Sequence, residues 1–308
     1  MTAGRLLNYS SRLTIFEHAP ASGSYHPTIV LFIGGLGDGL GTVPYVPALA
    51  QALDAQGWGV AELLFSSSYE GWGFGSLSRD AKEMARAIGF LQTNKETSKK
   101  RIVLMGHSTG TQNLIYYATQ NINPSIPRPP VDGLILQASV SDREAFVKSN
   151  GEEKWQEALA YAQDLLLADI ETQSKALIKA EAPGFSPIPP KYTRLFFGAQ
   201  ISSYRWVSLM KVRGDDDFFS SDLDDKDFES TFGKVSVPLL VLYSGADEYV
   251  PVKVDKKSLV KRFQNATKSD FWSPLSHVVP DATHNLADSP QSSYDDLISS
   301  VVAFIQSV

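Results

Sequence analysis

The 308-residue sequence contains no cysteine, which excludes disulfide bonds, thiolate nucleophiles and zinc sites built on cysteine. It also lacks an excess of positive charge, since 28 lysine and arginine residues face 34 aspartate and glutamate residues. A protein that binds nucleic acid needs a basic surface for the phosphates. We therefore expect no nucleic-acid partner.

Long apolar runs are missing as well. No stretch approaches the roughly 20 apolar residues that a membrane-spanning helix requires, and residues 1–18 contain no uninterrupted apolar run of the kind found in signal peptides. These features predict a soluble, cytoplasmic protein without a membrane partner. The sequence carries no signal for the oligomeric state.

Short apolar, β-branched runs alternate with longer amphipathic segments along most of the chain. This alternation is typical of βαβ units, and it predicts an α/β fold with a mostly parallel, doubly wound sheet. Strands are expected at residues 12–18, 27–33, 60–65, 101–105, 133–139, 238–245 and 277–280, and helices at residues 45–56, 76–92, 109–119, 257–266 and 292–306.

A long segment interrupts this rhythm before the strand at 238–245. We assign residues 1–140 and 234–308 to the core domain and residues 141–233 to an insertion that acts as a lid over the site. The insertion has a helical pattern from Glu152 to about Ala180. Residues 141–230 contain 17 acidic and 11 basic side chains, a balance of -6. We expect this charge to favour cationic ligands at the mouth of the site.

Residues Gly106 to Gly110, GHSTG, fit the G-x-S-x-G pattern of a nucleophile elbow. In such an elbow a serine lies on a strained turn between a strand and a helix, and the glycines allow the two to approach closely. The segment lies between an apolar strand-like run and a helix-like run. Ser108 is therefore the candidate nucleophile.

A serine hydroxyl needs a base to remove its proton and a carboxylate to orient that base, and in this pattern they follow in the order serine, acid, histidine. Asp247 lies just after an apolar strand and is the candidate acid, with Glu248 and Asp142 as alternatives. His284 lies on a polar loop after the last strand and is the candidate base. His277 precedes that strand, so we expect it to have a structural role.

The glycine-rich segment from Gly34 to Gly39, GGLGDG, follows the strand at 27–33. We expect its Leu36 N–H and the Thr109 N–H to form an oxyanion hole, with Gly35 and Gly37 as neighbouring candidates. A nucleotide-binding loop is disfavoured, because neither G-x-G-x-x-G nor G-x-x-x-x-G-K-[ST] is present in this segment.

These motifs resemble the α/β-hydrolase superfamily across nearly the whole chain. The strings FIGGLGDGL, SYEGWGFGSLSRD, MGHSTGTQ and GDDDFFSSDL further resemble a fungal α/β-hydrolase family that includes siderophore esterases acting on fusarinine-type compounds. The resemblance implies a small-molecule ester substrate, with hydrolysis of ornithine-ester linkages in ferric siderophores taken up by the cell. The alternatives are a carboxylesterase or thioesterase for other acyl compounds, and a non-catalytic binding protein with this fold.

Two further groups of residues bear on the site. Tyr69, Trp72 and Phe74 are spaced by glycines and are candidates for lining the substrate pocket, although loop packing explains them as well. Asp215 to Asp217 suggest a calcium site, but the pattern of a calcium-binding loop is absent. Helix capping, with a capping box from Ser221 to Asp224, is the favoured explanation. We expect no metal and no cofactor.

Overall fold

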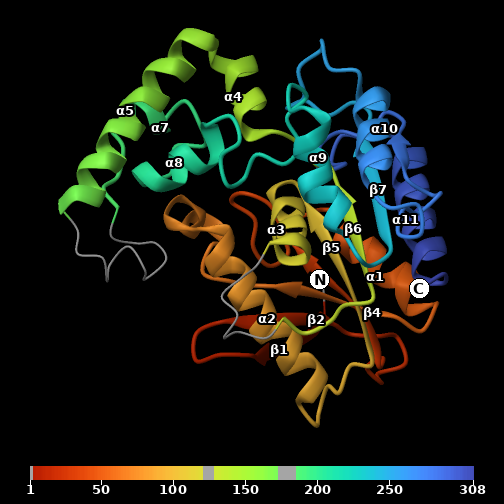
Figure 1. Ribbon diagram of the computed structural model, residues 1–308. Helices are drawn as coiled ribbons and strands as arrows, with labels where there is room; N and C mark the ends of the chain where they lie inside the picture. Colours follow the sequence, from red (N-terminus) through yellow and green to blue (C-terminus); the bar gives the residue numbers. More distant parts are fainter. Residues whose placement is uncertain (1–2, 121–127, 173–184) are drawn as a thin grey trace.

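The computed structural model describes residues 3–120, 128–172 and 185–308 (Figure 1). An eight-stranded sheet forms the centre, in the order β1-β2-β4-β3-β5-β6-β7-β8. The β1–β2 and β2–β4 pairs are antiparallel, and all later pairs are parallel. The predicted α/β class with a mostly parallel sheet is confirmed. The strands are β1 (Gly4–Asn8), β2 (Thr14–His18), β3 (Thr28–Ile33), β4 (Gly59–Leu63), β5 (Arg101–His107), β6 (Gly133–Gln137), β7 (Leu239–Ser244) and β8 (His277–Val279).

Helices cover both faces of this sheet because the central strands are apolar on both sides. In β3, Ile29, Leu31 and Ile33 contact one layer of helices, whereas Val30 and Phe32 contact the other. The first layer contains α2, α3, α9 and α10, and the second contains α1 and α11. The bounds are α1 (Val46–Asp54), α2 (Leu77–Thr93), α3 (Thr109–Thr119), α9 (Asp225–Thr231), α10 (Lys256–Ala266) and α11 (Gln291–Ile305).

Strand β1 was not expected from the sequence. It lies at the edge of the sheet, and Leu7 is its single buried residue. An edge strand with one buried side chain lacks the apolar alternation that predicts a strand.

Among the described residues, no helix combines the length and the apolar character that crossing a bilayer requires.

The insertion between β6 and β7 divides into two parts that pack differently. Its first part contains α4 (Asp142–Asn150), α5 (Glu152–Thr172), α7 (Pro190–Thr193) and α8 (Ser203–Met210). These helices share a small core of their own, which includes Phe146, Phe196 and Trp206 and also takes in Trp72. Figure 1 shows α5 at the outer edge of this part, away from the sheet. The predicted helix over 152–180 is present to Thr172, and its remainder lies outside the described residues.

The second part of the insertion packs against the sheet domain. Phe228 of α9 and Phe232 of the short helix η2 (Phe232–Lys234) contact Phe263 of α10, and the rings of Phe232 and Phe263 stack at 4.5 Å between centroids. The capping box that begins α9 joins Asp224 to Asp227, not Ser221 to Asp224 as expected. The predicted box was wrong because α9 begins later than the sequence pattern suggested.

Candidate active site

Ser108 lies on a strained turn between β5 and α3. Its backbone has a φ of 54° and a ψ of -127°, a conformation that non-glycine residues rarely adopt. A Cβ on Gly110 would lie 2.2 Å from the Ile33 carbonyl oxygen, and one on Gly106 would lie 2.6 Å from the Gly110 backbone. Only glycine fits at either position. The geometry is that of the nucleophile elbow expected from the sequence.

His284 and Asp247 meet beyond the ends of β8 and β7. His284 Nδ1 lies 2.8 Å from Asp247 Oδ2, and the Asp247 side chain is fully buried. The other carboxylate oxygen of Asp247 accepts a hydrogen bond from the Tyr249 N–H at 3.0 Å. Glu248 instead accepts from the His284 backbone N–H at 2.9 Å. Asp247 is therefore the acid that contacts the imidazole ring of His284, whereas Glu248 contacts only the backbone of the loop that carries His284.

His277 lies at the start of β8, at the opposite end of the strand from the loop that carries His284. Its Nε2 lies 3.1 Å from Asp296 on α11, and its Nδ1 donates to the Leu275 carbonyl at 2.7 Å. These contacts join β8 to α11 and match the expected structural role.

His107 precedes the serine and belongs to a buried polar network centred on Gln137. Gln137 donates its amide hydrogens to Ser244 Oγ and to the His284 carbonyl, both at 3.1 Å. Its oxygen must then accept from the Tyr45 hydroxyl at 3.0 Å and from His107 Nδ1 at 2.6 Å. Burial, assisted by the neighbouring His284, lowers the pKa of His107 to about 4. His107 is therefore neutral at physiological pH.

The glycine-rich segment reaches the serine directly. A Cβ on Gly35 would lie 2.6 Å from Ser108 Cβ, so only a glycine allows this approach. The Gly35 N–H donates to Asp38 Oδ2 at 2.7 Å and is not available to a ligand. Within the described part of the chain, the Leu36 N–H has no acceptor. Thr109, the first residue of α3, carries an N–H without an intrahelical acceptor.

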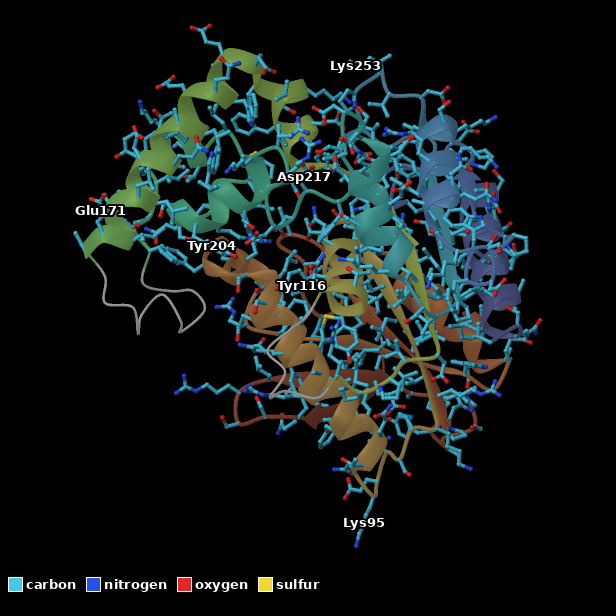
Figure 2. All side chains as sticks on the ribbon, in the orientation of Figure 1. Lys95, Tyr116, Glu171, Tyr204, Asp217 and Lys253 are labelled. Atoms are coloured by element: carbon cyan, nitrogen blue, oxygen red, sulfur yellow. The ribbon has the colours of Figure 1, made fainter. Side chains whose placement is uncertain are left out.

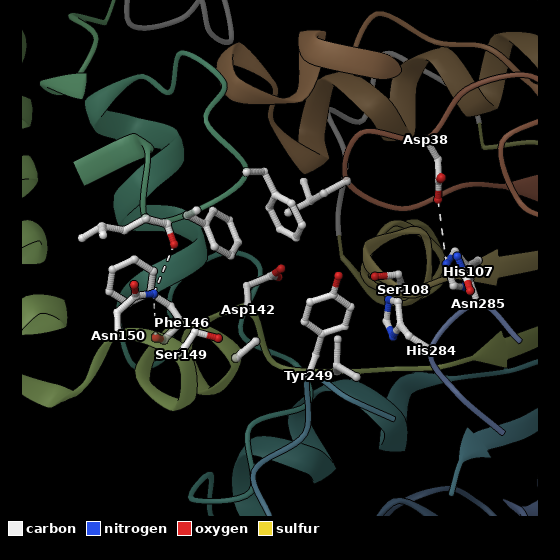
Figure 3. A pocket seen from close by; sticks show the side chains of 16 residues that line it. Asp38, His107, Ser108, Asp142, Phe146, Ser149, Asn150, Tyr249, His284 and Asn285 are labelled. Carbon is white, nitrogen blue, oxygen red and sulfur yellow. Dashed lines mark hydrogen bonds and ion pairs between the residues drawn. The ribbon is translucent and has the colours of Figure 1, made fainter. Parts of the chain in front are cut away.

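A cavity of about 270 Å³ lies beside Ser108, between the sheet domain and the insertion (Figure 3). Figure 3 shows the Ser108 hydroxyl next to the ring of His284 at one end of the cavity. The residues that line it are Leu36, Asp38, His107, Ser108, Val140, Asp142, Ala145, Phe146, Ser149, Asn150, Leu195, Phe196, Phe197, Tyr249, His284 and Asn285.

Asp142, weighed above as an alternative acid, begins α4 and lines this cavity instead of contacting His284. Its Oδ2 accepts a hydrogen bond from Gln112 Nε2 at 2.7 Å. Burial raises the pKa of Asp142 to about 7; Asp216 acts in the same direction, whereas the Gln112 hydrogen bond and the charges of Arg205 and His284 act against it. The carboxyl therefore changes its charge near neutral pH.

Several candidate binding residues do not line the cavity. Trp72 is buried under the insertion, with its ring edge-on to Phe196 at 6.0 Å and to Phe197 at 6.4 Å. Tyr69 points to the glycine-rich segment, where its hydroxyl accepts from the Leu40 N–H at 3.1 Å. Neither Phe74 nor Gly37 is among the lining residues.

The acidic segment over 214–229 does not line the cavity either. Asp215, Asp217 and Asp227 border a different cavity, of about 370 Å³, beside the end of α3. Figure 2 shows Asp217 beside α9. Buried Asp216 binds Arg205 at 2.7 Å, and Asp227 binds Arg213 at 2.8 Å. The carboxylates of this segment therefore do not contribute to the charge of the cavity lining, whereas the expectation that the whole insertion favours cationic ligands stays a prediction.

Other residues of the site were missed in the sequence. Gln137 could have been found, because a single amide at the end of an apolar strand must be hydrogen-bonded when buried. No sequence pattern marked Phe146 and Phe197 as site residues, because only the tertiary packing of the insertion brings their side chains to the cavity. Among the described residues, no group of three or more potential metal-ligating side chains comes together.

The family model described as "Protein of unknown function (DUF1749)" matches residues 1–306. Esterase AN6793 of Emericella nidulans is 37% identical over 92% of this chain and 87% of its own length. Fusarinine C esterase sidJ of Aspergillus fumigatus is 34% identical over 94% of this chain and 91% of its own length. The solved structure of siderophore hydrolase EstB from Aspergillus fumigatus covers 100% of this chain and 98% of its own, with 32% identity and a TM-score of 0.82.

The sheet order, the helices on both faces and the structural neighbours establish the α/β-hydrolase fold. Relatives named as esterases match over nearly their whole length, and the protein is accordingly a carboxylic ester hydrolase. The chain belongs to the DUF1749 family.

Proposed function

We propose that the protein is a serine esterase that hydrolyses ester bonds of a fusarinine-type siderophore inside the cell and so releases its iron. The observation that carries the proposal is the contact between His284 Nδ1 and Asp247, next to Ser108 on a strained elbow in the same cavity. The names of the relatives support the choice of siderophore.

In the proposed reaction, Ser108 Oγ attacks the ester carbonyl while His284 Nε2 takes the hydroxyl proton. Asp247 accepts a hydrogen bond from the Nδ1–H of His284, which fixes the orientation of the imidazole ring, and its negative charge stabilises the imidazolium that forms. The N–H groups of Leu36 and Thr109 bind the developing oxyanion. His284 then protonates the leaving alcohol. In the second half of the reaction, a water molecule attacks the acyl-enzyme while His284 takes its proton, and His284 returns this proton to Ser108 as the acid product leaves.

The cavity sets a limit on how the substrate binds. At about 270 Å³ it has room for one arm of a large siderophore but not for the whole ferric complex. We therefore propose that one ester-linked arm enters the cavity and that the iron-binding remainder stays outside.

Incubation with ferric fusarinine-type siderophores and with simple carboxylic and thioesters, followed by mass spectrometry of the products, tests the substrate. Ser108→Ala is expected to lose about 10⁴-fold to 10⁶-fold in kcat, and a fluorophosphonate should label the wild type at Ser108. Cleavage of simple esters alone would reject the siderophore. Ser108→Ala activity above about a tenth of wild type would reject the mechanism, because a triad nucleophile contributes far more than that.

A further inference from the structure

The cavity beside Ser108 is lined by acidic and aromatic side chains. Among the described residues that line it, two are carboxylates and none is lysine or arginine. Four are phenylalanine or tyrosine, and the faces of their rings attract cations. These rings belong to Phe146, Phe196, Phe197 and Tyr249. The lining is therefore suited to a positively charged group and poorly suited to an anion.

The two carboxylates of the cavity, Asp38 and Asp142, differ in what already binds them. Both oxygens of Asp38 are used, since they accept from the Gly35 N–H at 2.7 Å and from the Thr42 hydroxyl at 2.9 Å. In Asp142, Oδ2 accepts from Gln112, whereas Oδ1 has no hydrogen-bond partner in the described part of the chain. Figure 3 shows the Asp142 carboxylate pointing into the cavity between Phe146 and Tyr249.

The position of this carboxylate is fixed relative to the nucleophile. Gln112 lies on α3, four residues after Ser108, and its amide therefore holds Asp142 on the helix that begins at the elbow. The Asp142 side chain is buried, so bulk water screens its interactions only weakly. This carboxylate should therefore bind a positively charged ligand much more tightly than a neutral ligand of the same shape.

We propose that Asp142 is a specificity-determining residue that binds an ammonium group of the ester substrate. The ammonium lies between the Asp142 carboxylate and the aromatic rings, while the ester carbonyl of the same molecule reaches Ser108. This inference rests on the proposed esterase function of the cavity, and it assigns that function a substrate class, namely esters with a cationic substituent.

Two pairs of esters with matched shapes test the proposal at pH 8. The 2-(trimethylammonio)ethyl and 3,3-dimethylbutyl esters of butyrate differ by a fixed charge on the alcohol. The methyl esters of 4-(trimethylammonio)butanoate and 5,5-dimethylhexanoate differ by the same charge on the acyl chain. In at least one pair, we expect wild-type kcat/KM to favour the cationic ester by about tenfold or more, because the fixed positive charge contacts a buried carboxylate and aromatic rings.

Asp142→Asn keeps the shape of the side chain and should remove this preference, with the cationic ester losing at least about tenfold more than the neutral ester. Asp215→Asn is the matched control, because it removes one negative charge from the exposed acidic segment outside the cavity. It should keep the wild-type ratio. If Asp142→Asn lowers kcat/KM equally for both esters, so that their ratio is unchanged, the proposal is overturned and Asp142 is a purely structural residue.

A labelling experiment covers the case in which none of the four esters is turned over. Pentylammonium should slow fluorophosphonate labelling of Ser108 more than pentan-1-ol does in the wild type, but not in Asp142→Asn. Equal protection by both compounds would reject the ammonium site while leaving the nucleophile in place. Absence of labelling and of ester cleavage would instead reject the proposed function, so the two failures are distinguishable.

Discussion

His284 is held at two points, through its ring by Asp247 and through its backbone N–H by Glu248. Asp247→Asn should lower kcat by about 10⁴-fold, because an amide no longer favours the Nδ1–H tautomer. Glu248→Gln should cost far less, since it alters a backbone contact of an exposed side chain. Steady-state kinetics on one ester measures both variants, and the reverse order would exchange the roles of the two acids.

The two late histidines offer a second comparison at the residue scale. His284→Ala should be almost inactive with an unchanged melting temperature. His277→Ala should keep most of its turnover but lose stability, because it removes the contact with Asp296 that joins β8 to α11. Parallel measurements of kcat and thermal unfolding separate these outcomes. A large loss of turnover in His277→Ala would contradict the assignment.

Asp142 should reduce stability as the pH rises. Its pKa is about 7 in the folded protein, compared with about 3.9 in an unfolded chain. Between these values the folded state binds more protons than the unfolded state, so the free energy of unfolding falls with increasing pH until about pH 7. Asp142→Asn should remove this loss. Its melting temperature relative to wild type should therefore be higher at pH 8 than at pH 4.5, and a constant difference would contradict the shifted pKa.

At the scale of elements, the contact between the glycine-rich segment and the elbow is the sensitive one. Gly35→Ala places a methyl group against Ser108 and should lower kcat by about 10²-fold, as small displacements of catalytic groups do. Gly37 has a φ of 78° with open space around it, so Gly37→Ala should destabilise the fold by about 1 kcal/mol without a clash at the serine. Kinetics and thermal unfolding of both variants test whether only Gly35→Ala impairs catalysis. Equal kcat values for Gly35→Ala and Gly37→Ala would refute this expectation.

At the scale of the whole molecule, Arg205 joins the first part of the insertion to the segment that leads into its second part, and this second part packs against the sheet domain. Arg205 lies on α8, is buried, and binds the equally buried Asp216 at 2.7 Å. Arg205→Met leaves an unpaired buried carboxylate, which typically costs about 3–5 kcal/mol. We expect faster hydrogen exchange in 142–172 and 186–210 than in the sheet strands. Adding Asp216→Leu should restore protection, and uniform loss over the whole chain would show that the insertion does not open separately.

Local sequence patterns were sufficient for the sheet strands other than β1 and for the elbow, and they suggested the candidate triad. Apolar periodicity reports which faces are buried, and the glycines around Ser108 report a close backbone approach, because both are properties of neighbouring residues. The order serine, acid, histidine then pointed to Asp247 and His284 although they lie 37 residues apart. The edge strand β1 escaped this reasoning, because its side chains are mostly exposed.

The lining of the cavity was decided by tertiary structure alone. Gln112 and Asp142 lie 30 residues apart, and no local pattern predicts that α3 and α4 bring them together. Likewise, net charge counted along the insertion did not reveal that Asp216 faces Arg205 while Asp142 faces the cavity. The sequence by itself determined the fold class and the candidate chemistry, because these follow from local sterics and burial. The position of charge relative to Ser108 depends on how distant segments pack, and only the folded chain determines it.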